Sequence, residues 1–326
     1  MTTAVLCLRP RADFERAGAL PPSSLNVTYR GPDDADVHAL MKGTSALVIP
    51  AVGPALSPAL FEGTALKLIQ VTGAGLDRLD RPTIQRLGLP VANVPGGSNR
   101  AVAEYAVTMA STLLRRFAWA DAEIRRGNYS AFRARMVSDN LGGLDGLLVG
   151  VVGLGTIGLA VAEAFQHMGC RICFYDPAPP NPAAAHALGA ESMSLDGLLT
   201  ASDVVTLHVP LLPATKNLIG DREMALMKPG AILIQASRGG IVDELALATH
   251  LRAGHLGGAA IDVYSSEPPG ADHALLALDG EAARRVLFTP HIAGVTRQSA
   301  AFLCRSAWRN VERVLIDGVA PLNRAY

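Results

Sequence analysis

Short apolar runs alternate with helical patterns through the first hundred residues. The runs carry no charged side chain, as is typical of buried strands, and the segments between them place apolar residues at three- and four-residue steps. The expected strands are residues 4–8, 46–49, 68–71 and 91–94, and the expected helices are residues 33–41 and 80–87. Strands that alternate with helices indicate a parallel α/β sheet.

The longest helical pattern comes next, over residues 98–127. Ser98 or Asn99 can cap its start, and Gly127 can end it. A long helix at this place is expected to connect two α/β units.

A second α/β series runs from residue 147 to residue 290. Its expected strands are residues 147–152, 171–175, 204–208, 231–235, 259–263 and 286–289, and a last helix is expected over residues 296–317. If that helix packs on the first series, residues 1–98 and 296–326 form one discontinuous domain and residues 99–295 form the other. The predicted fold class is α/β, with two doubly wound parallel-sheet domains.

Composition excludes several classes of protein. Of 326 residues, 49% are hydrophobic, and 29 basic side chains balance 29 acidic ones. The apolar content excludes intrinsic disorder, and zero net charge gives no basic field for nucleic acid or an anionic membrane. Four cysteines are too few for a disulfide scaffold and fit a reducing compartment, and no secretory signal precedes the first strand. We therefore expect a cytoplasmic protein.

The strongest local motif is Gly153-Leu-Gly155-Thr-Ile-Gly158, which follows an apolar strand and opens a helix over residues 157–168. The first glycine permits a tight turn, the second lets a pyrophosphate approach the backbone, and the third lets helix and strand pack closely. The alternative is a glycine-rich turn without a ligand. Residues 147–162 carry no charge and imitate a membrane span, but these glycines favour a dinucleotide-binding turn.

Asp176 lies 18 residues after Gly158, where an acidic side chain can bond the ribose hydroxyls of a dinucleotide. A carboxylate there repels a 2′-phosphate, and residues 177–180 offer no arginine to receive one. The sequence therefore favours NAD over NADP. Asp176 can also cap the turn before Pro177, and the two roles are compatible.

Arg238, Glu267 and His291 each follow a different expected strand of the second series. Ligands of open α/β sheets bind at the carboxyl ends of the strands. An arginine there can hold a carboxylate by two parallel hydrogen bonds. A histidine suits proton transfer near neutral pH, and a carboxylate beside it fixes its tautomer and favours its charged form. Each residue alone could be structural, and their shared placement makes a common site the better interpretation.

Two further patterns are expected to be structural. Cys170 and Cys173 have CxxC spacing, but they belong to a buried strand in which residues three apart face opposite sides, so we expect core cysteines and no metal site. A basic region is expected to be a solvated face or a subunit contact rather than a nucleic-acid site. Its arginines are Arg115, Arg116, Arg125, Arg126, Arg133 and Arg135.

Taken together, the motifs resemble the D-2-hydroxyacid dehydrogenase family, with a pattern close to the core of its D-3-phosphoglycerate dehydrogenases. The resemblance covers the chain from about residue 68 to the last helix. The motifs are Gly153-Leu-Gly-Thr-Ile-Gly158, His208-Val-Pro210-Leu-Leu, Ala236-Ser-Arg238-Gly-Gly-Ile-Val-Asp243, Asp262-Val-Tyr-Ser-Ser-Glu267-Pro and Pro290-His291-Ile-Ala-Gly294. The chain ends soon after the last helix, so the C-terminal regulatory domain of many phosphoglycerate dehydrogenases is not expected.

The resemblance implies roles for individual residues. Arg238, Glu267 and His291 are implied to be catalytic, and Ala74 and Gly75, with Arg238, to bind the substrate carboxylate. The residues implied to bind NAD are Gly153, Gly155, Thr156, Ile157, Gly158, Asp176, Val209, Pro210, Ala236, Ser237, Arg238, Asp262, His291 and Gly294. Asp262 matches the residue that holds the nicotinamide amide. The implied fold is a flavodoxin-like substrate domain and a Rossmann NAD-binding domain with a cleft between them.

The activity that this resemblance implies is NAD-dependent interconversion of a 2-oxo acid and a D-2-hydroxy acid, in a homodimer. A corepressor-like protein that senses NAD(H) with little turnover is the alternative, because such relatives keep the same three residues. Ala74 stands where phosphite dehydrogenases carry a lysine, Glu267 where formate dehydrogenases carry a glutamine, and Thr156 where an arginine is usual. The sequence leaves the particular 2-oxo acid open.

Overall fold

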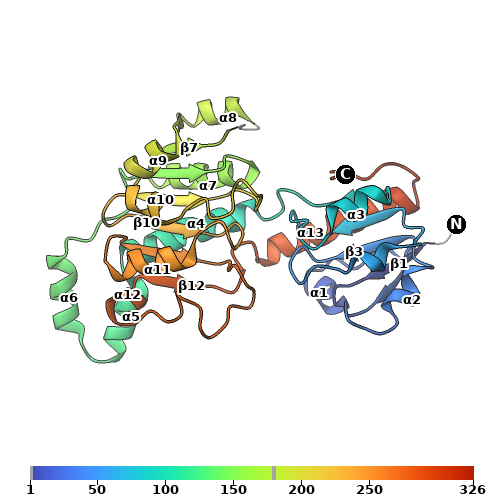
Figure 1. Cartoon of the computed structure of the whole chain (residues 1–326), viewed down its shortest axis with the longest axis horizontal. Coiled ribbons are helices and arrows are strands. Elements are labelled where there is room, and N and C mark those ends of the chain that lie inside the picture. Colours follow the sequence, from blue (N-terminus) through green and yellow to red (C-terminus); the bar gives the residue numbers. More distant parts are fainter. Residues whose placement is uncertain (1–2, 178–180) are drawn as a thin grey trace. The chain divides into compact units, whose positions relative to one another are not determined.

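The chain folds into two compact units, each with its own sheet and core. The structure is a computed structural model that describes residues 3–177 and 181–326 (Figure 1). The first unit consists of Met1–Ser98 and Val295–Tyr326, and the second unit is Asn99–Gly294.

The first unit is built on a parallel sheet whose described strands have the order β2-β1-β3-β4-β5. Its strands are β1 (Ala4–Cys7), β2 (Asn26–Tyr29), β3 (Ala46–Ile49), β4 (Leu68–Val71) and β5 (Val91–Ala92). Its helices are α1 (Arg11–Arg16), α2 (Val37–Met41), the 3-10 helix η1 (Pro58–Phe61), α3 (Arg81–Arg86) and α13 (Arg297–Leu315). This strand order is the flavodoxin-like one, which confirms the doubly wound fold predicted here.

The C-terminal helix α13 packs on the sheet of the first unit. Thr296 caps its start, because its hydroxyl oxygen accepts the Ser299 N–H at 3.1 Å. Cys304 and Trp308 of α13 share one hydrophobic cluster with Val48 of β3 and Leu68 of β4. The first unit is therefore completed by residues from the far end of the sequence.

The second unit is built on a longer parallel sheet with the described order β12-β11-β10-β9-β6-β7-β8. Its strands are β6 (Leu148–Val152), β7 (Arg171–Tyr175), β8 (Glu191–Ser192), β9 (Val204–Leu207), β10 (Ile232–Gln235), β11 (Gly258–Ile261) and β12 (Val286–Phe288). Its helices are α4 (Asn99–Leu114), α5 (Phe117–Arg125), α6 (Tyr129–Ser138), α7 (Thr156–His167), α8 (Pro182–Ala187), α9 (Leu195–Ala201), α10 (Asp221–Leu226), α11 (Glu244–Arg252) and α12 (Gly280–Ala283). The strand order reverses beside β6, which is where doubly wound sheets bind nucleotides.

Alternate residues of the central strand β6 face two separate cores. Val149 and Val151 pack with residues of α4 and α7, whereas Val152 packs with residues of α9, α10 and α11. Helices therefore cover both faces of this sheet, and its central strands are buried on both sides.

Sequence patterns missed two of the edge strands, β2 and β8, because these lack an apolar run. The residues of β2 are partly exposed or exposed, and both residues of β8 are exposed. The prediction of one continuous helix over residues 98–127 is wrong. The chain leaves the helix at Arg116, whose φ of 53° is left-handed, and α5 then buries none of its own residues. Among residues 3–177 and 181–326, every helix is too short or too polar to cross a bilayer.

Candidate active site

The glycine turn after β6 has the geometry that a dinucleotide needs. Gly153 has a φ of +91°, and a Cβ there would meet the His208 carbonyl oxygen at 2.8 Å. A Cβ on Gly158 would meet the Gly153 carbonyl oxygen at 2.0 Å, so α7 can pack this closely only without a side chain. A Cβ on Gly155 would meet nothing within 4 Å. The open side of Gly155, with Thr156 and Ile157 starting α7, suits the approach of a pyrophosphate.

Asp176 lies at the rim of this turn, directly after β7. Its Oδ2 accepts the Leu154 N–H at 2.8 Å, and the Gly153 N–H donates to the Tyr175 carbonyl oxygen at 2.8 Å. The carboxylate therefore belongs to the glycine turn itself. Of the prolines and alanine that follow, residues 178–180 lie outside the described residues.

The loop of Arg238 is shaped by a buried glutamine at the end of β10. Gln235 is buried, its Nε2 donates to the Arg238 carbonyl oxygen at 2.8 Å, and its Oε1 accepts the Ser237 hydroxyl at 2.7 Å. A Cβ on Gly239 would meet the Tyr264 carbonyl oxygen at 1.7 Å. Glycine at this position therefore lets the Arg238 loop touch the segment that leads to Glu267.

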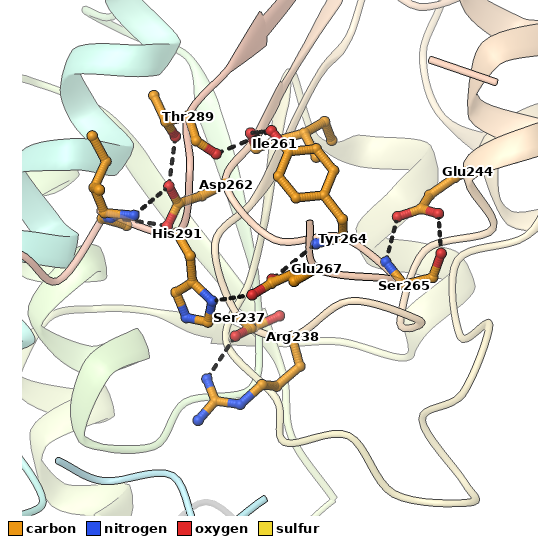
Figure 2. A network of polar contacts seen from close by, with 12 residues as sticks. Ser237, Arg238, Glu244, Ile261, Asp262, Tyr264, Ser265, Glu267, Thr289 and His291 are labelled. Carbon is orange, nitrogen blue, oxygen red and sulfur yellow. Dashed lines mark hydrogen bonds and ion pairs between the residues drawn. The ribbon is translucent and has the colours of Figure 1, made fainter. Parts of the chain in front are cut away.

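Glu267 and His291 form a pair, as Figure 2 shows. His291 Nδ1 lies 2.8 Å from Glu267 Oε2, and Glu267 Oε1 accepts the Tyr264 N–H at 3.1 Å. Their side chains are 24% and 31% exposed, so a small molecule can reach them. His291 has a φ of 55°, and its N–H donates to the Asp262 carbonyl oxygen at 2.8 Å. The structure thus brings two of the three predicted catalytic residues into direct contact, with Arg238 on the adjoining loop.

Asp262 shapes the loop of His291 through both carboxylate oxygens. Oδ1 accepts the Ile292 N–H at 2.8 Å and the Thr289 hydroxyl at 2.5 Å, and Oδ2 accepts the Ala293 N–H at 2.8 Å. Thr289 in turn accepts from the Tyr105 hydroxyl at 2.8 Å, and burial raises the pKa of Tyr105. Sequence reasoning missed Tyr105 and Thr289, although the position of Thr289 just before Pro290-His291 was a usable signal. The expected contact of Asp262 with the nicotinamide amide stays a prediction.

The remaining residues expected to bind the cofactor follow strands of the same sheet. Val209 and Pro210 follow β9, Ala236 and Ser237 follow β10, and Gly294 follows β12. Because the strands are parallel, all of these residues lie at the edge that also carries the glycine turn.

His208 lies between β9 and Val209 and has an environment unlike that of His291. Its Nε2 lies 2.8 Å from the Thr206 hydroxyl oxygen. Burial lowers the pKa of His208 to about 3, because the charged ring loses its hydration. With this lowered pKa, His208 is neutral near pH 7.

Ala74 and Gly75 lie in the first unit, in the loop after β4. The Asn93 side-chain amide donates to the Ala74 carbonyl oxygen at 2.8 Å. A Cβ on Gly73 would meet Ala51 Cβ at 2.6 Å, so this loop packs closely on the loop after β3. The predicted part of Ala74 and Gly75 in substrate binding stays a prediction.

The two cysteines with CxxC spacing pack in different cores. Cys173 belongs to the cluster under α9, α10 and α11, and Cys170 to the cluster under α4 and α7. The prediction of core cysteines is confirmed. Within residues 3–177 and 181–326, no group of three or more His, Cys, Asp or Glu side chains could hold a metal ion.

Comparison with known proteins finds a matching family model and curated relatives. The family model "D-isomer specific 2-hydroxyacid dehydrogenase, NAD binding domain" matches residues 107–293. The chain is 37% identical over 234 residues to the D-3-phosphoglycerate dehydrogenase of Archaeoglobus fulgidus, which covers 72% of this chain and 42% of that protein. It is 36% identical over 249 residues to the (S)-sulfolactate dehydrogenase of Chromohalobacter salexigens, which covers 76% of each.

Solved structures give a matching fold. The apo-structure of D-lactate dehydrogenase from Escherichia coli matches with a TM-score of 0.79 and 27% identity, covering 99% of each chain. The chain spans about half the length of the phosphoglycerate dehydrogenases that it matches.

Proposed function

This chain belongs to the D-isomer specific 2-hydroxyacid dehydrogenase family, and we propose that it interconverts a 2-oxo acid and a D-2-hydroxy acid with NAD. The observation that carries the proposal is the His291–Glu267 pair, with Nδ1 and Oε2 2.8 Å apart. The pair lies at the same edge of the sheet as the glycine turn. A nucleotide turn beside a proton donor supports reduction of a carbonyl group.

His291 is the proposed proton donor in reduction. Because Nδ1 faces Glu267, Nε2 is the ring nitrogen that can reach the substrate oxygen. The carboxylate favours the charged imidazolium, whose Nε2 proton goes to the carbonyl oxygen as that atom becomes a hydroxyl. In the reverse direction the neutral ring accepts the hydroxyl proton. When bound, NAD(H) supplies or accepts the hydride at the adjoining carbon.

Arg238 is the proposed anchor of the substrate carboxylate. A guanidinium can bind a carboxylate by two parallel hydrogen bonds and so fix the orientation of the neighbouring carbonyl. Its loop is held by Gln235 and by the close approach of Gly239 to Tyr264, which support a fixed position. The backbone N–H groups of Ala74 and Gly75 are proposed to bind the same carboxylate.

Asp176 is the proposed determinant of cofactor choice. Its carboxylate, fixed by the Leu154 N–H, would bond the ribose hydroxyls of NAD and repel the 2′-phosphate of NADP. The glycine turn, the start of α7 and the loops after β9, β10 and β12 would hold the rest of the cofactor.

Steady-state oxidation of NADH with a panel of 2-oxo acids tests the proposal. The panel should contain glyoxylate, hydroxypyruvate, phosphohydroxypyruvate, sulfopyruvate and longer apolar 2-oxo acids, and it also identifies the preferred substrate. Turnover with at least one of them, giving the D product, is the expected result. Tight NADH binding without turnover on any of them would instead favour the NAD(H)-sensing, corepressor-like alternative.

A homodimer in a reducing compartment is part of the proposal. Cys7, Cys170, Cys173 and Cys304 are buried thiols, which fits such a compartment. The dimer rests on family resemblance, and light scattering after size-exclusion chromatography measures it. A monomeric mass of about 34.1 kDa would contradict it.

A further inference from the structure

A second histidine–glutamate pair lies behind the segment that carries Glu267. His273 Nε2 lies 3.0 Å from Glu244 Oε2. The two side chains are 9% and 14% exposed, less than half the values for His291 and Glu267. This pair is therefore poorly placed to contact a substrate. Its role has to follow from the residues that it contacts.

Glu244 holds the backbone two residues before Glu267. The Ser265 N–H donates to Glu244 Oε1 at 2.8 Å, and the Ser265 hydroxyl donates to Oε2 (Figure 2). The neighbouring Tyr264 N–H donates to Glu267 Oε1 at 3.1 Å. The Glu244 carboxylate therefore fixes residues 264–267, the short segment from which the Glu267 carboxylate reaches His291.

His273 fixes the orientation of Glu244 in turn. Its Nδ1 accepts the Leu275 N–H at 3.4 Å, so the ring proton lies on Nε2 and is donated to Glu244 Oε2. The ring also meets the Tyr264 ring edge-on, with centroids 5.9 Å apart. Both carboxylate oxygens of Glu244 thus accept hydrogen bonds, and the donors are Ser265 and His273.

Glu244 also directly follows the loop that carries Arg238. It is the first residue of α11, and the preceding Asp243 caps that helix by accepting the Ala246 N–H at 3.0 Å. At the other end of this loop, Gly239 backs onto the Tyr264 carbonyl oxygen. The loop of Arg238 and the segment of Glu267 are therefore in contact at two places, through Glu244 and through Gly239.

We propose that Glu244, oriented by His273, is a positioning residue that keeps Glu267 against His291 and keeps the Arg238 loop beside them. The inference rests on the proposed function, because it acts through the proposed proton donor. Misplacement of a reacting group by about 1 Å can cost about 10²-fold in rate.

Glu244→Gln is the main test. The amide keeps the length and one acceptor oxygen, but its NH₂ group cannot accept from the Ser265 hydroxyl and from His273. We expect kcat for reduction to fall about 10- to 100-fold with the Kd for NADH unchanged. The pH midpoint of reductive kcat/KM should move to lower pH, in the same direction as in Glu267→Gln and by no more.

A double-mutant cycle separates positioning from a direct effect of charge. The charged side chains around His291 are Glu267, Asp262 and, on the adjoining loop, Arg238 (Figure 2). If Glu244 acts through Glu267, Glu244→Gln should no longer move the midpoint once Glu267→Gln is present. Additive shifts would show that Glu244 acts on His291 directly and would overturn the proposal.

Glu223→Gln is the matched control. Glu223 also accepts a backbone N–H at a helix start, from Gly220 at 3.1 Å, and is 19% exposed, but its partners Gly220 and Arg222 lie outside residues 264–267. Glu223→Gln should lower the melting temperature without moving the pH midpoint of reductive kcat/KM. If Glu244→Gln behaves in the same way, Glu244 is only structural and the proposal is wrong.

If the Glu244→Gln protein does not fold, two variants at His273 test the same proposal. His273→Ala removes the donor to Glu244. It should reduce kcat and shift the pH midpoint of reductive kcat/KM, in each case by less than Glu244→Gln does. His273→Gln restores an amide donor and should recover most of the lost kcat and most of the shift in the midpoint. Equal behaviour of the two would contradict the proposal. If Glu267→Gln itself leaves the midpoint unmoved, the proposed function fails, and this outcome is distinct from a failure confined to Glu244.

Discussion

Both edges of the sheet in the second unit, one at the carboxyl ends and one at the amino ends of its strands, carry charged side chains, but in different arrangements. At the carboxyl ends of the strands, the glycine turn and the loops of Arg238, Glu267 and His291 converge. At the amino ends of β10, β11 and β12, arginines surround Trp119. Their guanidinium carbons lie over its ring at 5.5 Å for Arg116, 4.5 Å for Arg135 and 4.8 Å for Arg284.

The arginines around Trp119 form ion pairs with neighbouring carboxylates. Arg135 lies 2.7 Å from Glu281, and Arg116 pairs with Asp139. Hydrogen bonds from these arginines lower the pKa of Glu281 and of Asp139. A cavity of about 290 Å³ lies among them, but each of its arginines already has an acidic partner or a ring to stack on. This arginine cluster ties α5 and α6 to α12 and to Arg284, which follows it.

The direction of the strands, rather than the density of charge, therefore locates the candidate site. Loops at the carboxyl ends are shaped by backbone contacts, such as Gly239 on Tyr264 and Asp262 on Ile292, that aim a few side chains outward. At the amino ends the side chains bind one another. The comparison predicts that substitutions at the first edge change chemistry and those at the second change only stability.

The largest effect is expected from His291→Ala. Loss of the proposed proton donor should lower kcat/KM for reduction by about 10²–10⁴-fold, the usual contribution of general acid catalysis. The pH dependence of the reductive reaction should disappear with the histidine. NADH affinity, measured by fluorescence titration, should survive because the glycine turn is untouched. Activity within tenfold of the wild type would remove His291 from the mechanism.

Arg238→Lys is expected to come next, with a loss of about 10- to 100-fold in kcat/KM for the 2-oxo acid. Lysine keeps the charge but cannot form two parallel hydrogen bonds with a carboxylate. The matched control is Arg135→Lys at the opposite edge, which should leave kcat/KM within about twofold. Similar kinetics for the two variants would break the contrast between the edges.

Glu267→Gln should move the pH midpoint of reductive kcat/KM to lower pH. The substitution keeps the shape but removes a negative charge 2.8 Å from His291 Nδ1, so the imidazolium is less favoured and protons are lost at lower pH. The oxidative reaction should then begin at lower pH as well. A midpoint that stays in place would show that the two residues are not coupled.

Asp176→Ser should narrow the preference for NADH over NADPH by about tenfold. A like-charge contact with the 2′-phosphate disappears, while serine can still bond a ribose hydroxyl. The ratio of kcat/KM values for the two cofactors measures the effect. A wild-type enzyme that prefers NADPH would refute the role proposed for Asp176.

Local patterns predicted most of the fold but not the contacts between distant segments. The strand at 171–175 and the glycine turn were predictable because a buried run and three glycines are local signals. Strand β8 was not, because two exposed residues at a sheet edge leave no apolar pattern. The Glu244–His273 pair was missed for another reason: its members lie 29 residues apart in sequence, and they are brought together by the pairing of β11 with β10.

The smallest effect concerns stability in acid and separates the two edges by pH. At the carboxyl edge, burial lowers the pKa of His208 to about 3, below the value of about 6.5 for an unfolded histidine. Between these values the unfolded chain binds the extra proton, so stability falls as pH falls, by at most about 1.4 kcal/mol per pH unit. At the amino edge, the pKa of Glu281 is also lowered, from 4.5, so its contribution is lost only below about that pH. Urea unfolding between pH 7 and 5 should therefore become less pH-dependent in His208→Gln and stay unchanged in Glu281→Gln, and the reverse result would show that the arginine cluster carries the acid sensitivity.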